Sequence, residues 1–135
     1  MNATVKSMTA EASKKVVSDF LGAWQKRDVP GIMDCFAPDA IYHNVPVAPI
    51  KGVDGIREIF EGFLQAFEYA ELEIVRIAAE PNLVFAERVD HFRLHDGRSV
   101  DLPVNGVFEL RDGKIWRFSD YFDLASFEDP TGLKL

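Results

Sequence analysis

One acidic residue near the end of the sequence falls in a row of aromatic residues. The stretch I-W-R-F-S-D-Y-F-D, residues 115–123, alternates as a β-strand would, and the alternation places Asp120 on a face with large rings. The rings are those of Trp116, Phe118 and Phe122. A buried carboxylate without a partner costs several kcal/mol or takes up a proton. We therefore expect Asp120 to have a specific partner.

The candidate partner lies on another predicted strand, residues 83–94. Alternation there places Arg88 and Asp90 on one face together with Phe92. The planar guanidinium group of Arg88 can hold a carboxylate on either side, so we expect it to lie between Asp90 and Asp120. The alternative is an Arg88–Asp90 pair solvated on an outer face, with Asp120 as an edge charge, since charged side chains are mostly exposed.

Two aspartates that share one guanidinium group can divide acid and base work between them. In an apolar pocket such a pair would keep one proton and titrate as a unit. The acid could then protonate a leaving oxygen on one side of a substrate while the carboxylate removes a proton from water on the other. Tyr42 and Asn44 share a face of a short predicted strand, and their hydroxyl and amide groups are of the right type to hold that water.

Three helices are expected before the strands that carry the acids. The first spans residues 9–26, with an apolar stripe made by Val16, Val17, Phe20, Leu21 and Trp24. Asp28 and Pro30 end it and open a second, shorter helix through Phe36. The third begins near Val53 and has the most regular apolar pattern in the chain, made by Ile56, Ile59, Phe60, Phe63, Leu64 and Phe67.

The remaining elements are predicted to be strands. A short strand at residues 40–44 and a loop enforced by Pro46 and Pro49 precede the third helix. Four strand-like runs follow it, at residues 69–79, 83–94, 99–110 and 114–122. The pairs that separate them favour tight turns: Pro81-Asn82, Asp96-Gly97 and Asp112-Gly113. Helices first and antiparallel strands later predict an α+β fold in which one sheet curls around the helices and leaves a pocket at its mouth.

Composition bounds the class of protein. The chain has 135 residues, which is the size of one domain, residues 1–135, with one core. It is 47% hydrophobic and 27% charged with eleven Phe, as expected of a globular protein in which some rings line a cavity. The first eight residues and residues 129–132 look like loose ends.

Charge and hydropathy argue against several partners. A net charge of −7 without a Lys/Arg cluster longer than two residues argues against a nucleic acid. The single cysteine, Cys35, cannot form an internal disulfide, and no signal peptide or long apolar run is apparent. We expect a cytoplasmic protein without a membrane partner. The three histidines share no zinc-ligand spacing with a carboxylate or with Cys35, which argues against a metal site.

The polar residues lie in motifs that resemble a known family. Y-H-N at Tyr42 to Asn44, E-R-V-D at Glu87 to Asp90 and D-Y-F-D at Asp120 to Asp123 closely resemble the limonene-1,2-epoxide hydrolase family in order and spacing. G-V-F-E-L at residues 106–110 and D-G-K-I at residues 112–115 extend the likeness, which runs from the first helix to about Phe127.

The resemblance implies a fold and a reaction. The fold is a cone-shaped α+β domain of the nuclear-transport-factor-2 type, a curved mixed sheet packed on three N-terminal helices and usually a homodimer. Neither a metal nor an organic cofactor is implied. In that family an Asp-Arg-Asp triad adds water to an epoxide in one step, without a covalent intermediate, and gives a vicinal diol. The partner implied is a small hydrophobic epoxide.

The same resemblance implies a role for each polar residue. Asp90 would be the general acid that protonates the epoxide oxygen, and Arg88 would orient both acids. Asp120 would be the general base on the attacking water, with Tyr42 and Asn44 as the other ligands of that water. These five positions all match the family pattern.

Apolar residues are predicted to face the substrate on the basis of resemblance and alternation together. They are Leu21, Trp24, Phe92, Leu102, Val104, Phe122 and Phe127. Any one of them could instead belong to the core, since large apolar residues are usually buried for packing alone. Trp24 is bulkier than the aliphatic residue expected from the family, so we expect it to shorten the pocket.

Two other functions fit the same fold. One is a ketosteroid-isomerase-like or polyketide-cyclase-like enzyme, in which an aspartate moves a carbon-bound proton. Such a site would gain little from an arginine wedged between two acids. The other is a small-molecule-binding or dimerisation module without catalytic activity.

Overall fold

The apolar stripe near the N-terminus forms helix α1 (Ala10–Gln25) in the computed structural model, which describes residues 8–135. The side chain of Thr9 caps this helix by accepting a hydrogen bond from the backbone N–H of Ala12, which satisfies a donor of the first turn. The buried face of α1 carries Phe20 and Trp24. Of the first eight residues, predicted to be a loose end, residues 1–7 lie outside the described part of the chain.

The second helix is shorter than the sequence predicts. α2 (Val29–Met33) begins at the Asp28 cap and ends before Phe36, which instead opens strand β1 (Phe36–Asn44). The prediction of helix through Phe36 and of strand only from residue 40 is therefore wrong. The reason is tertiary: Phe36 pairs in the sheet with Ile115, whose backbone N–H donates to the carbonyl of Cys35.

The third helix matches its apolar pattern. α3 (Val53–Ala66) buries Ile56, Phe60 and Leu64, one from each successive turn. Just before it, β2 (Ile50–Lys51) pairs antiparallel with β1. The sequence did not predict β2, because two residues are too few to display an alternation.

The four later runs form strands close to their predicted bounds. They are β3 (Phe67–Glu80), β4 (Leu83–Leu94), β5 (Ser99–Arg111) and β6 (Lys114–Tyr121). Tight turns join them, and at the last one Asp112 and Gly113 both have positive φ, of 51° and 79°. The six strands form one sheet in the order β2-β1-β6-β5-β4-β3. The pairs β3–β4, β4–β5 and β5–β6 are antiparallel, whereas β1 runs parallel to β6, so the sheet is mixed.

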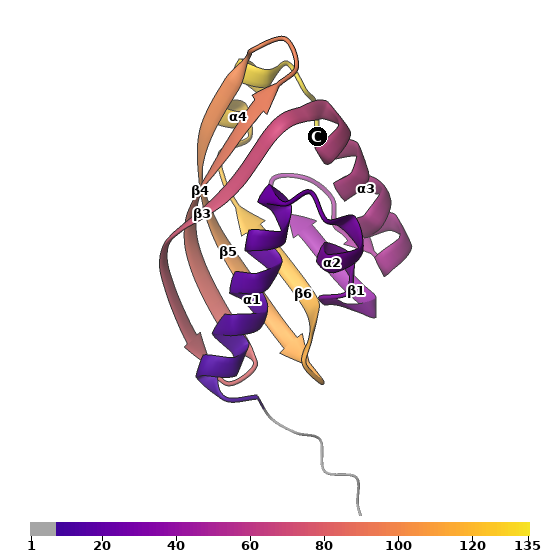
Figure 1. Ribbon diagram of the computed structural model, residues 1–135, viewed down its shortest axis with the longest axis vertical. Coiled ribbons are helices and arrows are strands. Elements are labelled where there is room, and N and C mark those ends of the chain that lie inside the picture. Colours follow the sequence, from indigo (N-terminus) through magenta and orange to yellow (C-terminus); the bar gives the residue numbers. More distant parts are fainter. Residues whose placement is uncertain (1–7) are drawn as a thin grey trace, which may run out of the picture.

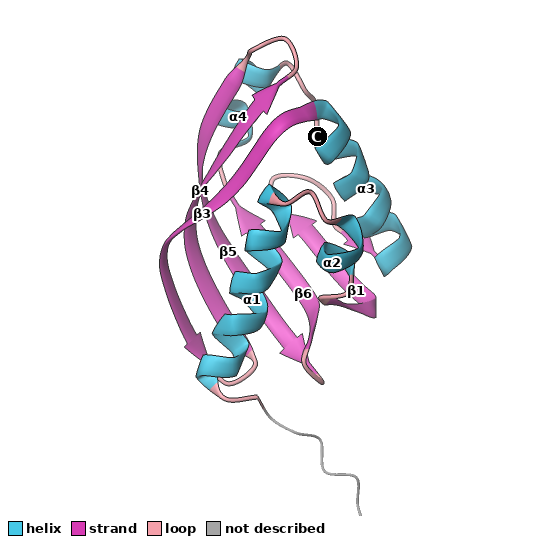
Figure 2. Ribbon diagram, in the orientation of Figure 1, coloured by secondary structure: helices cyan, strands magenta, loops and turns pink. Residues whose placement is uncertain are grey.

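The sheet curves, and α1, α2 and α3 lie on its inner side (Figure 1). Figure 2 shows the same division, with the long bent strands β3 and β4 wrapping past the helices. The α+β class and the curved mixed sheet over N-terminal helices, both expected from the sequence, are confirmed. Within residues 8–135 no helix is long and apolar enough to cross a membrane.

A bulge in β6 shifts the expected alternation at one residue. Glu109 on β5 pairs with Arg117 on β6, and the next residue, Leu110, pairs with Ile115. Trp116 therefore has no pairing partner on β5. Ile115 is fully buried in the core, whereas the half-buried Trp116 ring lies against the guanidinium group of Arg111, 5.4 Å from its centroid. The prediction that Trp116 shares the face of Phe118 and Asp120 is therefore wrong.

The C-terminal segment is helical, contrary to the prediction of a loose end at residues 129–132. α4 (Leu124–Thr131) begins at Asp123, whose side chain accepts from the backbone N–H of Ser126, and ends at Gly132 with a φ of 72°. Phe127 and Thr131 are its buried residues. α4 covers a second apolar cluster near one end of the sheet, and this packing stabilises a helix too short to persist alone.

Candidate active site

Strand register brings three charged residues together on the inner face of the sheet. Arg88 and Asp90 lie two residues apart on β4, so their side chains share a face. Asp120 lies on β6, and β5 runs between the two strands. On β5, Gly106 pairs with Ala86 on one side and with Asp120 on the other. The side chain of Arg88 must therefore reach across β5 to contact the carboxylate of Asp120.

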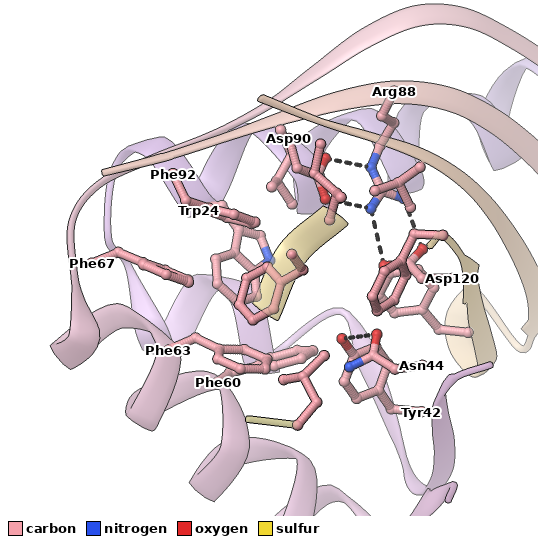
Figure 3. Close-up of a pocket in the computed structure, with 17 residues that line it drawn as sticks. Trp24, Tyr42, Asn44, Phe60, Phe63, Phe67, Arg88, Asp90, Phe92 and Asp120 are labelled. Atoms are coloured by element: carbon pink, nitrogen blue, oxygen red, sulfur yellow. Dashed lines mark hydrogen bonds and ion pairs between the residues drawn. The ribbon is translucent and has the colours of Figure 1, made fainter. Parts of the chain in front are cut away.

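The guanidinium group of Arg88 lies between the two carboxylates and donates to both oxygens of each (Figure 3). Its Nε and Nη2 lie 3.0 and 2.9 Å from Asp90 Oδ1 and Oδ2. Its Nη1 and Nη2 lie 2.9 and 3.0 Å from Asp120 Oδ1 and Oδ2. Two bidentate pairs on one planar group fix the positions of all three side chains.

The triad is buried. Arg88 is 1% exposed, Asp90 5% and Asp120 6%. The alternative interpretation of a solvated pair on the outer face is therefore wrong, and the expectation that Arg88 bridges the two acids is met by the geometry. Each carboxylate has the partner that burial requires.

Gly106 leaves the space in which the guanidinium group sits. A Cβ atom on Gly106 would overlap Arg88 Nη1 and would lie 2.9 Å from Asp120 Oδ1 and 3.0 Å from a ring carbon of Phe108. Any side chain larger than hydrogen would therefore push the arginine away from Asp120. The sequence offered no signal for this role, because a glycine within a strand has several possible reasons.

Burial and charge oppose each other at the triad. Burial raises the pKa of Asp120 above its ordinary value of 3.8, Arg88 lowers it, and the charge of Asp90 raises it again, with a net increase. Burial alone would lower the pKa of Arg88, but the two carboxylates raise it above its ordinary value. The site therefore holds a permanent cation beside an acid with increased proton affinity.

Tyr42 and Asn44 come to the same place from β1. Because β1 runs parallel to β6, Asn44 is the strand partner of Asp120. The hydroxyl group of Tyr42 donates to Asn44 Oδ1 at 2.7 Å, and both residues are buried. Burial, more than any nearby charge, raises the pKa of Tyr42 well above 10, so the phenol stays protonated. This bond leaves the Asn44 amide nitrogen as a donor and the Tyr42 oxygen as an acceptor toward the cavity.

These five polar residues line a cavity whose other walls are apolar (Figure 3). About 510 Å³ of non-atom space lies among its lining residues, a volume that includes space open to solvent. Six of the predicted apolar residues line it: Trp24, Phe92, Leu102, Val104, Phe122 and Phe127. Leu21 does not. It is buried in the main core, and Trp24, three residues further along α1, lines the cavity instead.

Several lining residues were not predicted. They are Phe60, Phe63, Phe67, Leu72, Phe118 and Leu135. Phe60, Phe63 and Phe67 belong to the apolar stripe that begins at α3, so the helical pattern could have identified them as wall residues once that face was assigned to the cavity. For Leu135, at the end of the chain, no periodic pattern exists.

The arrangement can hold and move protons in an apolar enclosure. Among residues 8–135, no three His, Cys, Asp or Glu side chains group as metal ligands. The groups that face the cavity are two acids joined by a cation, and a phenol and an amide beside one of them. Such a set can give a proton at one point and accept one at another, because each acid is held apart from the other by the guanidinium group.

Comparison with known proteins identifies relatives of the chain. Residues 17–118 match the family model of the SnoaL-like domain. The chain is 34% identical over 108 residues to epoxide hydrolase EphG of Mycobacterium tuberculosis (strain ATCC 25618 / H37Rv), a match that covers 80% of this chain and 71% of that protein. The likeness to epoxide hydrolases inferred from the sequence motifs is thereby confirmed.

Solved structures of differently described proteins share the fold of this chain. An LEH-like epoxide hydrolase of Mycobacterium tuberculosis superimposes with a TM-score of 0.80 at 29% identity, over 90% of each chain. A candidate polyketide cyclase of Xanthomonas campestris superimposes with a TM-score of 0.83, over 90% of this chain and 98% of that one. The second pair is only 20% identical and shows a shared fold alone.

Substitution of Gly106 should disturb the triad. We expect Gly106→Ala to lower the free energy of unfolding by about 1–3 kcal/mol, because the added methyl group overpacks the space of the guanidinium group. Urea denaturation measures the change. The control is Gly22→Ala, which adds the same methyl group on α1 where no atom lies within 4 Å, and which should be neutral or stabilising. Equal stability of Gly106→Ala and the wild type would contradict this role.

The raised pKa of Asp120 should make stability depend on pH. The folded state binds this proton more tightly than the unfolded chain, so the free energy of unfolding should fall as pH rises from the ordinary pKa of 3.8 through the raised folded value. Asp120→Asn cannot titrate, so it should lose this part of the slope, as urea denaturation at several pH values would reveal. The exposed Asp129→Asn on α4 is the control and should keep the wild-type slope. An unchanged slope in Asp120→Asn would argue against a raised pKa.

Proposed function

The chain belongs to the SnoaL-like domain family, and we propose that it is an epoxide hydrolase, as its relative of 34% identity is. We infer that it adds water to a small hydrophobic epoxide and releases a vicinal diol. The observation that carries the proposal is the bidentate clamp of Arg88 on Asp90 and Asp120 in the wall of an apolar cavity.

In the proposed reaction the two acids act on opposite ends of one displacement. Asp90 donates its proton to the epoxide oxygen as the C–O bond breaks. A water oxygen forms a bond to the ring carbon, and Asp120 takes the proton that this water loses. The proton count balances, because the pair begins and ends with one proton, which must return from Asp120 to Asp90 before the next turnover.

The surroundings of Asp120 support its assignment as the base. Its increased proton affinity makes it a stronger base than an exposed carboxylate. Asn44 is its partner on the neighbouring strand, so the amide nitrogen of Asn44 and the oxygen of Tyr42 can bind the water that Asp120 activates. A water held at three points is oriented for attack before the substrate reacts.

The hydrogen bonds of the carboxylates favour attack by water over attack by an aspartate. All four carboxylate oxygens accept from Arg88. A carboxylate whose two oxygens are both held by one planar group is fixed in place, so neither oxygen can easily move onto a ring carbon of the substrate. A covalent ester is therefore not part of the proposed path.

The isomerase-like and cyclase-like alternative has less support. The candidate polyketide cyclase shares the fold at 20% identity, whereas the two epoxide hydrolases are 34% and 29% identical to this chain. An enolate needs one base and a neutral donor, and Arg88 between two acids adds little to that chemistry. Assembly as a homodimer and a cytoplasmic location stay predictions from the sequence.

Removal of either proposed acid should abolish turnover. We expect Asp90→Asn and Asp120→Asn each to lower kcat by about 100-fold or more, because each removes one proton-transfer step. Diol formation from a panel of cyclic epoxides measures this effect, with a steroid enone assayed in parallel for isomerisation. Asp129→Asn is the matched control and should behave as the wild type. Near-normal hydrolysis by both site variants, or isomerisation without hydrolysis, would refute the assignment.

Isotope labelling separates direct hydration from a covalent path. In a single turnover with excess enzyme in oxygen-18 water, direct hydration puts the label in the diol, because the attacking oxygen comes from solvent. Mass spectrometry of the diol and of the peptides that contain Asp90 and Asp120 measures where the label goes. An unlabelled first-turnover diol, with label later found in an aspartate, would mean that a carboxylate attacks the epoxide.

A further inference from the structure

The indole nitrogen of Trp24 is a buried donor without a partner in the protein. Trp24 is 5% exposed, and within residues 8–135 its Nε1 is the one buried side-chain nitrogen or oxygen atom that makes no hydrogen bond. We propose that Trp24 Nε1–H donates a hydrogen bond to a neutral oxygen of the substrate. The preferred substrates would then be epoxides that carry a second oxygen, and this inference rests on the proposed hydrolase function.

Trp24 is held in a position to contact a ligand. It projects from α1, and its ring packs edge-on against Phe60 with centroids 4.9 Å apart and an interplanar angle of 68°. Both rings line the cavity. Figure 3 shows Trp24 on the side of the cavity that carries Phe67 and Phe92, apart from Tyr42 and Asn44, with its indole nitrogen at the edge of the ring that faces the middle of the cavity.

The acceptors in the cavity wall do not bond to the indole nitrogen. No oxygen of Asp90, Asp120, Asn44 or Tyr42 accepts a hydrogen bond from Trp24 Nε1. The other described lining residues are apolar. A phenylalanine at position 24 would offer an aromatic surface to Phe60 without burying a donor, and an unsatisfied buried donor is unfavourable. An acceptor on the ligand removes this cost.

The charge of the site indicates which oxygen the ligand brings. Arg88 is the only cation among the described residues that line the cavity, and it faces two carboxylates. A carboxylate or phosphate on the ligand would place a further anion in an apolar enclosure that holds no free cation, which is strongly unfavourable. The acceptor is therefore a carbonyl, ether or hydroxyl oxygen.

Two polar contacts would fix the orientation of such a substrate. The epoxide oxygen would lie at Asp90, and the second oxygen would lie at Trp24 on the apolar side of the cavity. The skeleton between them would contact the aromatic walls, including Phe60 and Phe92. A substrate held at both ends presents one ring carbon to the water at Asp120, so Trp24 would act as a specificity-determining residue rather than a catalytic one.

A pair of epoxides that differ only in the acceptor tests the proposal. A methylcyclohexene oxide with an acetyl group and its analogue with an isopropenyl group have nearly the same shape, but only the first carries a second oxygen. We expect wild-type protein to prefer the acetyl compound in kcat/KM by about 10-fold or more, since the analogue leaves the donor unpaired. Trp24→Phe should lose most of this preference.

The second tryptophan provides the matched control. The chain has two Trp, and Trp116 lies against Arg111 and is not among the residues that line the cavity. Trp116→Phe should keep the wild-type preference for the acetyl compound. Equal preferences in wild type and Trp24→Phe, or loss of the preference in both variants, would overturn the assignment to Trp24.

A binding measurement separates failure of this inference from failure of the proposed function. In wild-type protein, titration with cyclohexyl methyl ketone should shift the indole N–H resonance of Trp24, whereas isopropenylcyclohexane should not move it in the same direction. Trp24→Phe identifies the resonance by its absence. A ketone-specific shift without diol from any epoxide would refute the proposed hydrolase function and support Trp24 as a hydrogen-bond donor to ligands. Diol formation with no ketone-specific shift and no acetyl preference would support the hydrolase function and refute the role of Trp24.

Discussion

A guanidinium group buried between two carboxylates is the interaction on which the rest of this structure depends. None of the three charged groups could be buried alone without a large loss of hydration, so each must be placed against the others within a narrow range of distance. That requirement constrains the sheet. β4 and β6 must lie one strand apart, β5 must carry a residue without a side chain at Gly106, and Asp120 must project from the same face as Arg88. Parallel pairing of β1 with β6 then brings Asn44 next to the acid.

The aromatic residues give this ion cluster its chemical significance. The rings of Phe118, Phe60 and Phe92 help to line the space in front of the carboxylates and limit the access of solvent. In such surroundings electrostatic interactions are stronger than in water, and the proton affinity of Asp120 rises. The same walls provide apolar contact area for a ligand. Structure and chemistry therefore share one cause, because the packing that stabilises the fold also sets the properties of the acids.

Short-range periodicity predicted most of the fold and the polar part of the site. Alternation placed Arg88 and Asp90 on one face of a strand and Asp120 among aromatic rings, and the stripe of α3 located a helix within a residue or two. The errors have physical reasons. Trp116 does not lie on its predicted face because a bulge adds one residue to β6, and no local sequence pattern predicts such a bulge. Phe36 became strand because of a distant partner, Ile115, and α4 is stabilised by tertiary packing. The exclusion of Leu21 and the contribution of Leu135 depend on three-dimensional wall shape, and the need for a glycine at position 106 depends on the length of Arg88.

The position of β6 within the sheet has a consequence for how the chain acquires its structure during synthesis. β6 is the last strand in the sequence, yet it lies between β1 and β5 and joins the N-terminal part of the sheet to the later hairpins. While a ribosome is still making residues before 114, β1 and β5 lack their common neighbour, and their inward apolar residues remain without a complete core. Domains with such long-range pairing fold slowly and expose strand edges on the way. The sheet can therefore close only after residues 114–121 have left the ribosome and can pair with both neighbours.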